Sequence, residues 1–486
     1  MSTVIPVFKL NTIADLPRTK LIATLGPACN KPAVLREMIC RGVDLFRLNM
    51  AHGDQASHAS AVQAVRAAAI EAQRPVGILV DLPGPKIRLG QLFEEPLELE
   101  NGQFVRFVRG TESRNRLELT ANYAPLLDEL RVGHDIVLAD GIARLKVIEV
   151  FAGFVICEVT DGGTIRSRQG VNLPSTTLSI PALGEADRQK AIWAASVGAD
   201  YISLSFVRNA NEILELKDLL ASVGSEARVV AKIEKRESLD NLEQIIAVSD
   251  GVMVARGDLG VEIDIEKTPI AQKRIIRACQ QLGKPVIVAT QMLESMHHSK
   301  QPTRAEVSDV ANAILDGADA CMLSGETAIG EYPLEAARMM KKIMKETEEL
   351  LRNRPSVLTH HESDSAWEIL DSVMLGAAQI ARRLNARLVV IVTSHSTTSL
   401  VKSKQRDFVP TVCLTDDQLA AQRMSLYWGV VPIVVDDLKK YQSVPEFVLQ
   451  WAKDSLGLQV GERIVMILDN DELEGIHDTI AVAEVT

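Results

Sequence analysis

Charged and polar side chains gather at the ends of a series of short apolar runs along the chain. Arg47, Lys232 and Glu234 end or follow such runs, and Asp258 and Thr290 follow two more. Arginine and lysine bind phosphates and carboxylates, and a protein often contributes one or two carboxylates, such as Glu234 and Asp258, to a Mg²⁺ site. The full set at the ends of the runs is Arg47, Asn49, His52, Asp81, Gly84, Lys86, Arg88, Ser205, Arg208, Lys232, Glu234, Arg256, Gly257, Asp258, Thr290, Gln291, Ser324 and Glu326.

A barrel of parallel strands would bring these side chains together. Short runs rich in Val, Ile and Leu suit strands that are buried on both faces, and the amphipathic stretches between them suit crossover helices. Eight such units predict an α/β fold of the (β/α)8 TIM barrel type, whose active site lies at the carboxyl ends of the strands. The eight runs are Lys20–Leu25, Val43–Leu48, Val76–Val80, Tyr201–Phe206, Val229–Ile233, Gly251–Ala255, Pro285–Ala289 and Ala320–Leu323. A single lysine or glutamate at a strand end is usually only solvated, but this converging set indicates an anionic ligand.

Two regions depart from the barrel pattern. Between the third and fourth runs, short strand-like segments separated by turn residues predict an inserted all-β lid domain, placed to close over the barrel mouth. After a linker, four further strand-like runs alternate with helical segments and predict a C-terminal α/β domain. The expected division is an N-terminal segment 1–17, a barrel of 18–86 and 181–351, a lid of 87–180 and a C-terminal domain of 366–486.

Composition excludes several classes of protein. The chain has 486 residues and a formal net charge of −11, which argues against a general nucleic-acid-binding protein. No apolar stretch is long enough to span a bilayer, and no signal peptide precedes the barrel, so a cytoplasmic protein is expected. The six cysteines form no C-x-x-C pair and are expected to be reduced and buried. The sequence has neither a Walker A motif nor G-x-G-x-x-G, so side chains and metal ions would have to hold the phosphates of any nucleotide.

Several longer motifs resemble those of the pyruvate kinase family. They are Arg47–Gly53, Gly170–Pro174, Lys232–Glu234, Met253–Gly260, Ala289–Met296 and the stretch from Pro302–Glu306 through Glu326-Thr327. The resemblance is strong from about Arg18 to Leu351 and weaker over the third domain. It implies the transfer of a phosphoryl group from phosphoenolpyruvate to ADP, giving pyruvate and ATP.

The resemblance also implies roles for residues at the barrel mouth. Lys232 is expected to stabilise the transferring phosphoryl group, and Glu234 and Asp258 to hold Mg²⁺. Backbone N–H groups at Gly257 and Asp258 are expected to bind the substrate carboxylate, and Thr290 to assist protonation of the enolate, by orienting water.

Further expectations concern the nucleotide and the assembly. Arg47 and Arg88 are expected to neutralise phosphates, and Asn49, His52 and Arg88 to line the nucleotide site. A second Mg²⁺ would arrive with the nucleotide, and Mn²⁺ would substitute for Mg²⁺. The resemblance also implies a homotetramer.

The sequence departs from the family at the K⁺ site. Asn49 and Asp81 match the family's K⁺ ligands, but Ala51 and Leu82 stand where the family has serine and threonine. Lys86 replaces the glutamate associated with K⁺ dependence. Because oxygen ligands are lost where a positive charge is gained, we predict that the Lys86 ammonium takes the place of K⁺. The enzyme should then be active without K⁺.

The third domain carries a hydroxyl-rich loop where family members often bind a phosphorylated effector. Its residues are Thr393, Ser394, Ser396, Thr397 and Thr398. The loop lacks the family's glycine, and the acidic stretch 469–474 would repel a bisphosphorylated sugar. A sugar monophosphate or AMP is the expected effector; an ordinary helix cap and no effector at all are the alternatives.

Two alternative functions fit part of the same residue set. A metal-dependent carbon–carbon lyase on the same barrel could also use Glu234 and Asp258, but the inserted lid and the surroundings of Lys232 and Thr290 argue against it. A catalytically silent metabolite sensor would be expected to lack the central residues, and these are all present. Ser179 and Asn209 also differ from common family residues, and we expect these differences to affect lid closure or nucleotide affinity.

Overall fold

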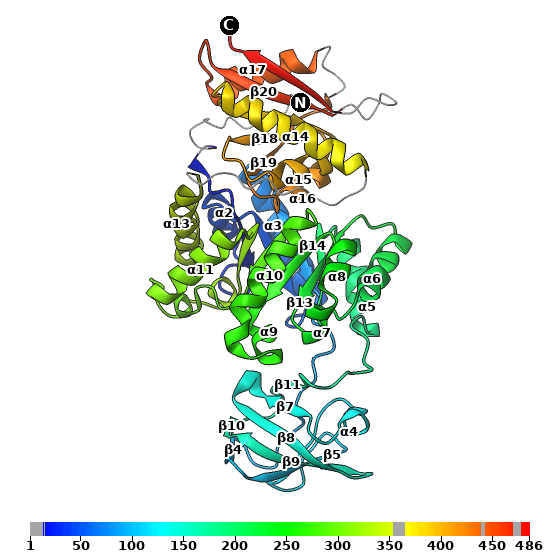
Figure 1. The fold of residues 1–486 in the computed structure, drawn as a ribbon. Helices are drawn as coiled ribbons and strands as arrows, with labels where there is room; N and C mark the ends of the chain where they lie inside the picture. Colours follow the sequence, from blue (N-terminus) through cyan, green and yellow to red (C-terminus); the bar gives the residue numbers. More distant parts are fainter. Residues whose placement is uncertain (1–12, 14, 353–364, 439–442, 470–477) are drawn as a thin grey trace.

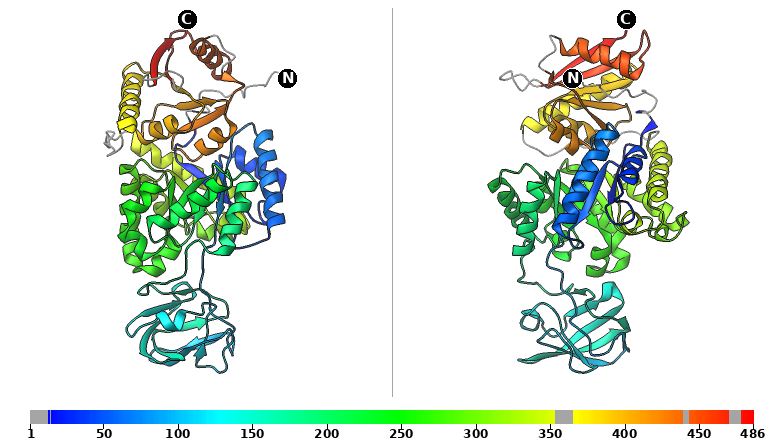
Figure 2. Two further views of the ribbon diagram at one scale, coloured as in Figure 1. Left: turned by 90° about the vertical axis from the view of Figure 1, so that its right-hand side faces the viewer. Right: turned by 180° about the vertical axis from the view of Figure 1, so that it is seen from behind.

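The computed structural model describes residues 13, 15–352, 365–438, 443–469 and 478–486. Most of the predicted N-terminal segment 1–17 therefore lies outside the described residues, as do positions 470–474 of the acidic stretch. The described chain forms three bodies in a row, with a central barrel, a small β body beyond one end and an α/β body beyond the other (Figures 1 and 2).

The central body is a closed barrel of eight parallel strands, which confirms the predicted (β/α)8 fold. The strand order around the barrel is β1-β16-β15-β14-β13-β12-β3-β2. The strands are β1 Lys20–Thr24, β2 Leu45–Asn49, β3 Gly77–Asp81, β12 Tyr201–Leu204, β13 Arg228–Ile233, β14 Gly251–Ala255, β15 Val286–Ala289 and β16 Ala320–Leu323.

Alternate residues of the barrel strands face two different cores. In β1, Leu21 and Ala23 pack into the layer between the strands and the outer helices, whereas Ile22 faces the barrel interior. This two-sided burial explains why the strands are nearly continuous apolar runs. The surrounding helices are α2 Pro32–Cys40, α3 Gln55–Glu71, α5 Glu185–Ser196, α6 Ala210–Ser222, α7 Arg236–Asp240, α8 Leu242–Val248, α9 Arg256–Glu262, α10 Thr268–Gln281, α11 Arg304–Asp316, α12 Gly325–Ala328 and α13 Pro333–Arg352.

The lid is an all-β body with its own hydrophobic core. Its six-stranded sheet has the order β11-β7-β8-β9-β5-β6, and a second sheet pairs β10 with β4. The strands are β4 Leu97–Leu99, β5 Phe104–Val108, β6 Glu118–Leu119, β7 Asp135–Leu138, β8 Ala143–Val150, β9 Phe154–Asp161, β10 Gly163–Ile165 and β11 Val171–Asn172; a short helix, α4, spans Leu126–Glu129. Two chain connections join the lid to the barrel, an outgoing one at residues 82–87 and a return one at residues 173–184 (Figure 2).

The C-terminal body is a five-stranded α/β sheet of order β19-β18-β17-β20-β21. It packs at the amino ends of the barrel strands, where Lys404 and Arg406 both pair with Asp319 just before β16. Its elements are α14 Ser365–Arg383, β17 Leu388–Val392, α15 Thr397–Lys404, β18 Thr411–Thr415, α16 Gln418–Met424, β19 Val430–Val434, α17 Val444–Leu456, β20 Arg463–Leu468 and β21 Thr479–Glu484.

Two general properties follow from the described chain. None of its helices has the length and apolar character needed to cross a membrane. All six cysteines are free thiols, and five are buried as expected, but Cys40 at the end of α2 is exposed.

Candidate active site

A buried cluster of charges joins the carboxyl ends of β2, β3 and β13. Arg47 donates to Asp81 Oδ2 from Nη2 at 2.5 Å and from Nε at 2.8 Å. Lys232 Nζ lies 3.5 Å from Asp81 Oδ1 and 3.3 Å from Glu234 Oε2, and it donates to Ser205 Oγ at 2.6 Å. The structure therefore brings Arg47, Asp81, Lys232 and Glu234 together, as the barrel register predicts.

Burial and opposite charge act against each other within this cluster. Burial alone would raise the pKa of Asp81, but the charges of Lys232 and Arg47 hold it below its ordinary value. Burial would likewise lower the pKa of Lys232, but Asp81 and Glu234 raise it. The ammonium of Lys232 thus stays positive in a buried position, where its charge acts strongly on a bound anion.

Glu234 has one satisfied and one unsatisfied carboxylate oxygen. Oε1 accepts a hydrogen bond from the backbone N–H of Phe206 at 2.6 Å, whereas the buried Oε2 accepts none. Burial raises the pKa of Glu234 to about 7; Lys232 opposes this rise, and the negative charge of Asp258 adds to it. A buried carboxylate oxygen that accepts no hydrogen bond and feels the charge of a second carboxylate, Asp258, fits a ligand set for Mg²⁺.

The segment after β15 presents Thr290 to the start of α9. The backbone N–H of Gly257 donates to Thr290 Oγ1 at 2.8 Å, so this N–H group is already engaged by Thr290. Thr290 and Gln291 have φ angles of 67° and 54°, in the left-handed region that β-branched residues rarely adopt. Arg256 holds this backbone, because its Nη2 donates to the carbonyl oxygens of Thr290 at 2.7 Å and of Gln291 at 2.9 Å.

Lys86 lies between the lid and the barrel. Its Nζ is 3.6 Å from Asp258 Oδ1 and 3.8 Å from Asp140 Oδ1 of the lid. Within the described residues, its ion pairs are with these two carboxylates and not with Asp81. The cations at Asp81 are instead Arg47 and Lys232. The positive charge of Lys86 therefore stands beside the candidate Mg²⁺ ligand Asp258.

The candidate nucleotide residues lie outside the buried cluster. Arg88 is exposed on the lid, where its Nη1 donates to the carbonyl oxygen of Arg168 at 3.1 Å. Asn49 Oδ1 accepts from the backbone N–H of Ala51 at 3.1 Å, and His52 is exposed. The structure does not bring these three side chains into contact with Lys232.

Two polar side chains complete the cluster and were not among the predicted site residues. Ser203 donates to Asp81 Oδ1 at 2.6 Å, and Thr24 accepts from Arg47 Nη1 at 3.2 Å. Ser203 precedes Ser205 by two positions in an otherwise apolar run, so both face the barrel interior. This alternation of serines was the available signal for Ser203.

The hydroxyl-rich loop of the C-terminal body follows β17. Thr393 donates to Asp469 Oδ2 at 2.6 Å, and Ser394 donates to Asp416 Oδ1 at 3.2 Å. No side chain caps the N-terminus of α15. The five hydroxyl residues divide into buried Thr393, Ser396 and Thr398 and exposed Ser394 and Thr397.

Comparison with known proteins identifies the family. The sequence profile described as "Pyruvate kinase, barrel domain" matches residues 16–337. The chain belongs to the pyruvate kinase family. The profile described as "Pyruvate kinase, alpha/beta domain" matches residues 371–483. The chain is accordingly an enzyme of the phosphotransferase class.

Individual relatives support the same assignment. A pyruvate kinase of Agrobacterium vitis is 42% identical over 427 residues, which cover 88% of each chain. Pyruvate kinase 2 of a Synechocystis species is 40% identical over 93% of this chain and 77% of its own. The crystal structure of a pyruvate kinase from Cryptosporidium parvum superposes with a TM-score of 0.88 and 32% identity, over 98% of this chain and 97% of that one.

Proposed function

We propose that this enzyme transfers the phosphoryl group of phosphoenolpyruvate to ADP, giving pyruvate and ATP. The observation that carries the proposal is the buried Lys232 ammonium, which lies 3.3 Å from Glu234 Oε2 at the carboxyl end of β13. A cation and an unsatisfied carboxylate oxygen at this position suit a phosphate that binds together with a metal ion.

The proposed roles follow from the charges of the cluster. Lys232 stabilises the negative charge on the phosphoryl group while its bond to the enol oxygen breaks and a bond to the ADP oxygen forms. Arg47 neutralises phosphate oxygens, and Asp81 and Thr24 fix its guanidinium. Thr290 orients the water that gives a proton to the methylene carbon of the enolate.

The substrate carboxylate would lie near Gly257 and Asp258. Because the N–H of Gly257 donates to Thr290 in the structure, carboxylate binding there requires the Thr290 hydroxyl to release it. Glu234 and Asp258 would hold Mg²⁺, which when bound supplies positive charge beside the phosphate and carboxylate oxygens. Mn²⁺ is expected to substitute, since it also accepts oxygen ligands.

The nucleotide site is proposed for Asn49, His52 and Arg88, with a second Mg²⁺ arriving on the nucleotide. His52 and Arg88 are both exposed, so their side chains are accessible to a nucleotide. Arg88 belongs to the lid, so closure of the lid would bring its charge toward the barrel mouth.

We further propose that activity does not require K⁺. The Lys86 ammonium supplies a permanent positive charge beside Asp258, while Ala51 and Leu82 offer no side-chain oxygen. The test is the rate of pyruvate formation with Mg²⁺ in sodium, tetramethylammonium and potassium buffers of equal ionic strength. Equal rates are expected, and a large loss outside potassium would refute the proposal.

The hydroxyl-rich loop is proposed to bind a sugar monophosphate or AMP. Exposed Thr397 is available to such a ligand, and Ser394 would have to release Asp416 to bind it. Asp416 and Asp469 lie beside the loop and oppose a second phosphate. Titration of ribose 5-phosphate, glucose 6-phosphate and AMP at subsaturating phosphoenolpyruvate tests this; flat rates with all three would refute it.

Three broader assignments stay predictions. They are the homotetramer, the cytoplasmic location, and the domain limits 18–86 with 181–351, 87–180 and 366–486. The separate hydrophobic core of the lid supports its division from the barrel.

A further inference from the structure

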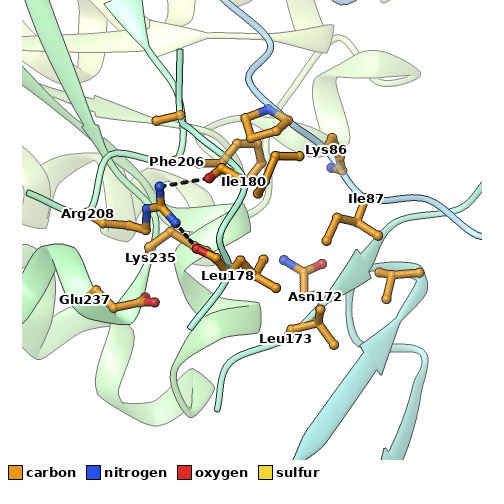
Figure 3. Close-up of a pocket in the computed structure, with 13 residues that line it drawn as sticks. Lys86, Ile87, Asn172, Leu173, Leu178, Ile180, Phe206, Arg208, Lys235 and Glu237 are labelled. Atoms are coloured by element: carbon orange, nitrogen blue, oxygen red, sulfur yellow. Dashed lines mark hydrogen bonds between the residues drawn. The ribbon is translucent and has the colours of Figure 1, made fainter. Parts of the chain in front are cut away.

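The junction of lid and barrel contains a hollow, and among the residues with a role in the proposed chemistry only Lys86 lines it. Both connections of the lid line it, together with Phe206, Arg208, Lys235 and Glu237 of the barrel (Figure 3). Lys235 is paired with Glu262 at 2.7 Å, and the side chains around it are mostly apolar. The hollow is therefore better suited to fixing the connections than to holding a charged ligand.

Arg208 fastens the return connection to the barrel. Its Nη1 donates to the carbonyl oxygen of Leu178 at 2.6 Å and its Nη2 to that of Ile180 at 2.9 Å (Figure 3). Glu212 of α6 orients the guanidinium, because it accepts from Nε at 3.0 Å and from the backbone N–H of Arg208 at 2.6 Å. A planar guanidinium that reaches two carbonyls fixes the backbone between them, which a lysine ammonium cannot do in the same way.

The same segment touches the other connection and the candidate metal ligand. Phe206, two residues before Arg208, donates its N–H to Glu234 Oε1 at 2.6 Å. Its ring packs on Gly84 of the outgoing connection so closely that a Cβ there would lie 2.6 Å from Phe206 Cδ2. Phe206 also has a φ of 57°, an uncommon conformation for a bulky residue that its surroundings must maintain.

We propose that Arg208 is a positioning residue that couples the lid to the Mg²⁺ site. It holds the return connection through Leu178 and Ile180, and the segment Phe206–Arg208 passes that constraint to the Glu234 carboxylate. A lid that moves away from the barrel therefore loosens Glu234, and a seated lid fixes it. The inference rests on the proposed function only in taking Glu234 as a Mg²⁺ ligand.

The test uses two variants of the full-length enzyme, Arg208→Lys and Glu212→Gln. The control is Arg188→Lys, which alters a neighbouring, more exposed ion pair between α5 and α6. Amide hydrogen exchange of residues 174–182 is measured without substrates, and steady-state kinetics give the Mg²⁺ activation constant. Since charged hydrogen bonds are lost, exchange is expected to quicken about tenfold. The Mg²⁺ constant should rise about tenfold while kcat stays within about threefold, and the control should change neither.

Each outcome decides one part of the inference. If amide hydrogens of residues 174–182 exchange in both variants at the rate of the parent enzyme, Arg208 does not hold the return connection. Faster exchange with an unchanged Mg²⁺ constant would overturn the coupling to Glu234. A parent enzyme that forms no pyruvate would refute the proposed function instead, and the exchange result would still decide whether Arg208 holds the lid.

Discussion

Replacement of Arg256 by lysine tests how the left-handed segment at Thr290 is maintained. The Arg256 side chain is only 8% exposed, and it pairs with Asp309 at 2.6 Å while donating to the carbonyls of Thr290 and Gln291. A hydrogen bond from a charged donor contributes about 1.5–3 kcal/mol. Each left-handed residue costs about 1–3 kcal/mol. The stabilisation from the Arg256 hydrogen bonds and the cost of the left-handed backbone are of similar size, so the conformation depends on Arg256.

A lysine in this position cannot reproduce the fork of the guanidinium. The loss of one bond, about 1.5–3 kcal/mol, is enough to let the segment relax and to displace the Thr290 hydroxyl. A displacement of about 1 Å can lower a rate by about a hundredfold. For Arg256→Lys we therefore expect kcat to fall by about ten- to a hundredfold, with the KM for phosphoenolpyruvate changed less than about threefold.

A double-mutant cycle in the pyruvate-formation assay checks the reasoning. If Arg256 acts through Thr290, then Arg256→Lys should cost little further activity in a Thr290→Val background. Arg274→Lys, which alters an exposed pair with Glu243 on the outer helices, serves as the control and should keep the parental rate. An equal loss from Arg256→Lys in both backgrounds would refute the reasoning.

The remaining predictions concern three other charged groups. Lys86→Glu places an anion where a cation now lies 3.6 Å from Asp258. The rate of pyruvate formation should therefore fall at least about tenfold, by the same factor in sodium buffer and in potassium buffer. A rate restored by potassium but not by sodium would contradict this prediction. Burial raises the pKa of Glu234 from 4.5 to about 7. Between these pH values the folded protein therefore holds a proton on Glu234 that the unfolded chain has lost. Without metal, the free energy of unfolding should consequently decrease as pH rises from 4.5 to about 7. Below pH 7, Mg²⁺ binding to Glu234 should release a proton, which calorimetry in two buffers of different ionisation enthalpy measures. The proton release should be absent in Glu234→Gln, and its absence in the parent enzyme would contradict the prediction. Lys404→Met removes one cation from buried Asp319 and should lower the free energy of urea unfolding by about 3 kcal/mol; an unchanged midpoint would refute it.

The barrel strands could be predicted because strands buried on both faces have a simple sequence pattern. Gly251–Ala255 was expected as a strand and is β14, and the run Val229–Ile233 differs from β13 by one residue. Both strands are covered on two faces, which requires an almost unbroken apolar run. The two-residue strands β6 and β11 were not predicted, since so short a segment shows no periodicity.

The positions of side chains between bodies were harder to predict. The charge of Lys86 could be read from the sequence, but its place beside Asp258 and Asp140 depends on how the lid meets the barrel. The engagement of the Gly257 N–H by Thr290 likewise depends on a left-handed turn between two strands. Neither feature follows from local sequence, because each joins segments that only the tertiary fold brings together.

The rate of pyruvate formation by Lys232→Met tests the central claim most directly. Methionine keeps much of the side-chain volume and removes the charge that lies 3.3 Å from Glu234 and 3.5 Å from Asp81. Lys217→Met, which alters a partly exposed pair with Asp250, is the matched control. We expect kcat of Lys232→Met to fall by at least about a thousandfold, with folding verified by circular dichroism and the control unaffected. A folded Lys232→Met protein with a rate within about tenfold of the parent would contradict the proposed role of Lys232 in phosphoryl transfer.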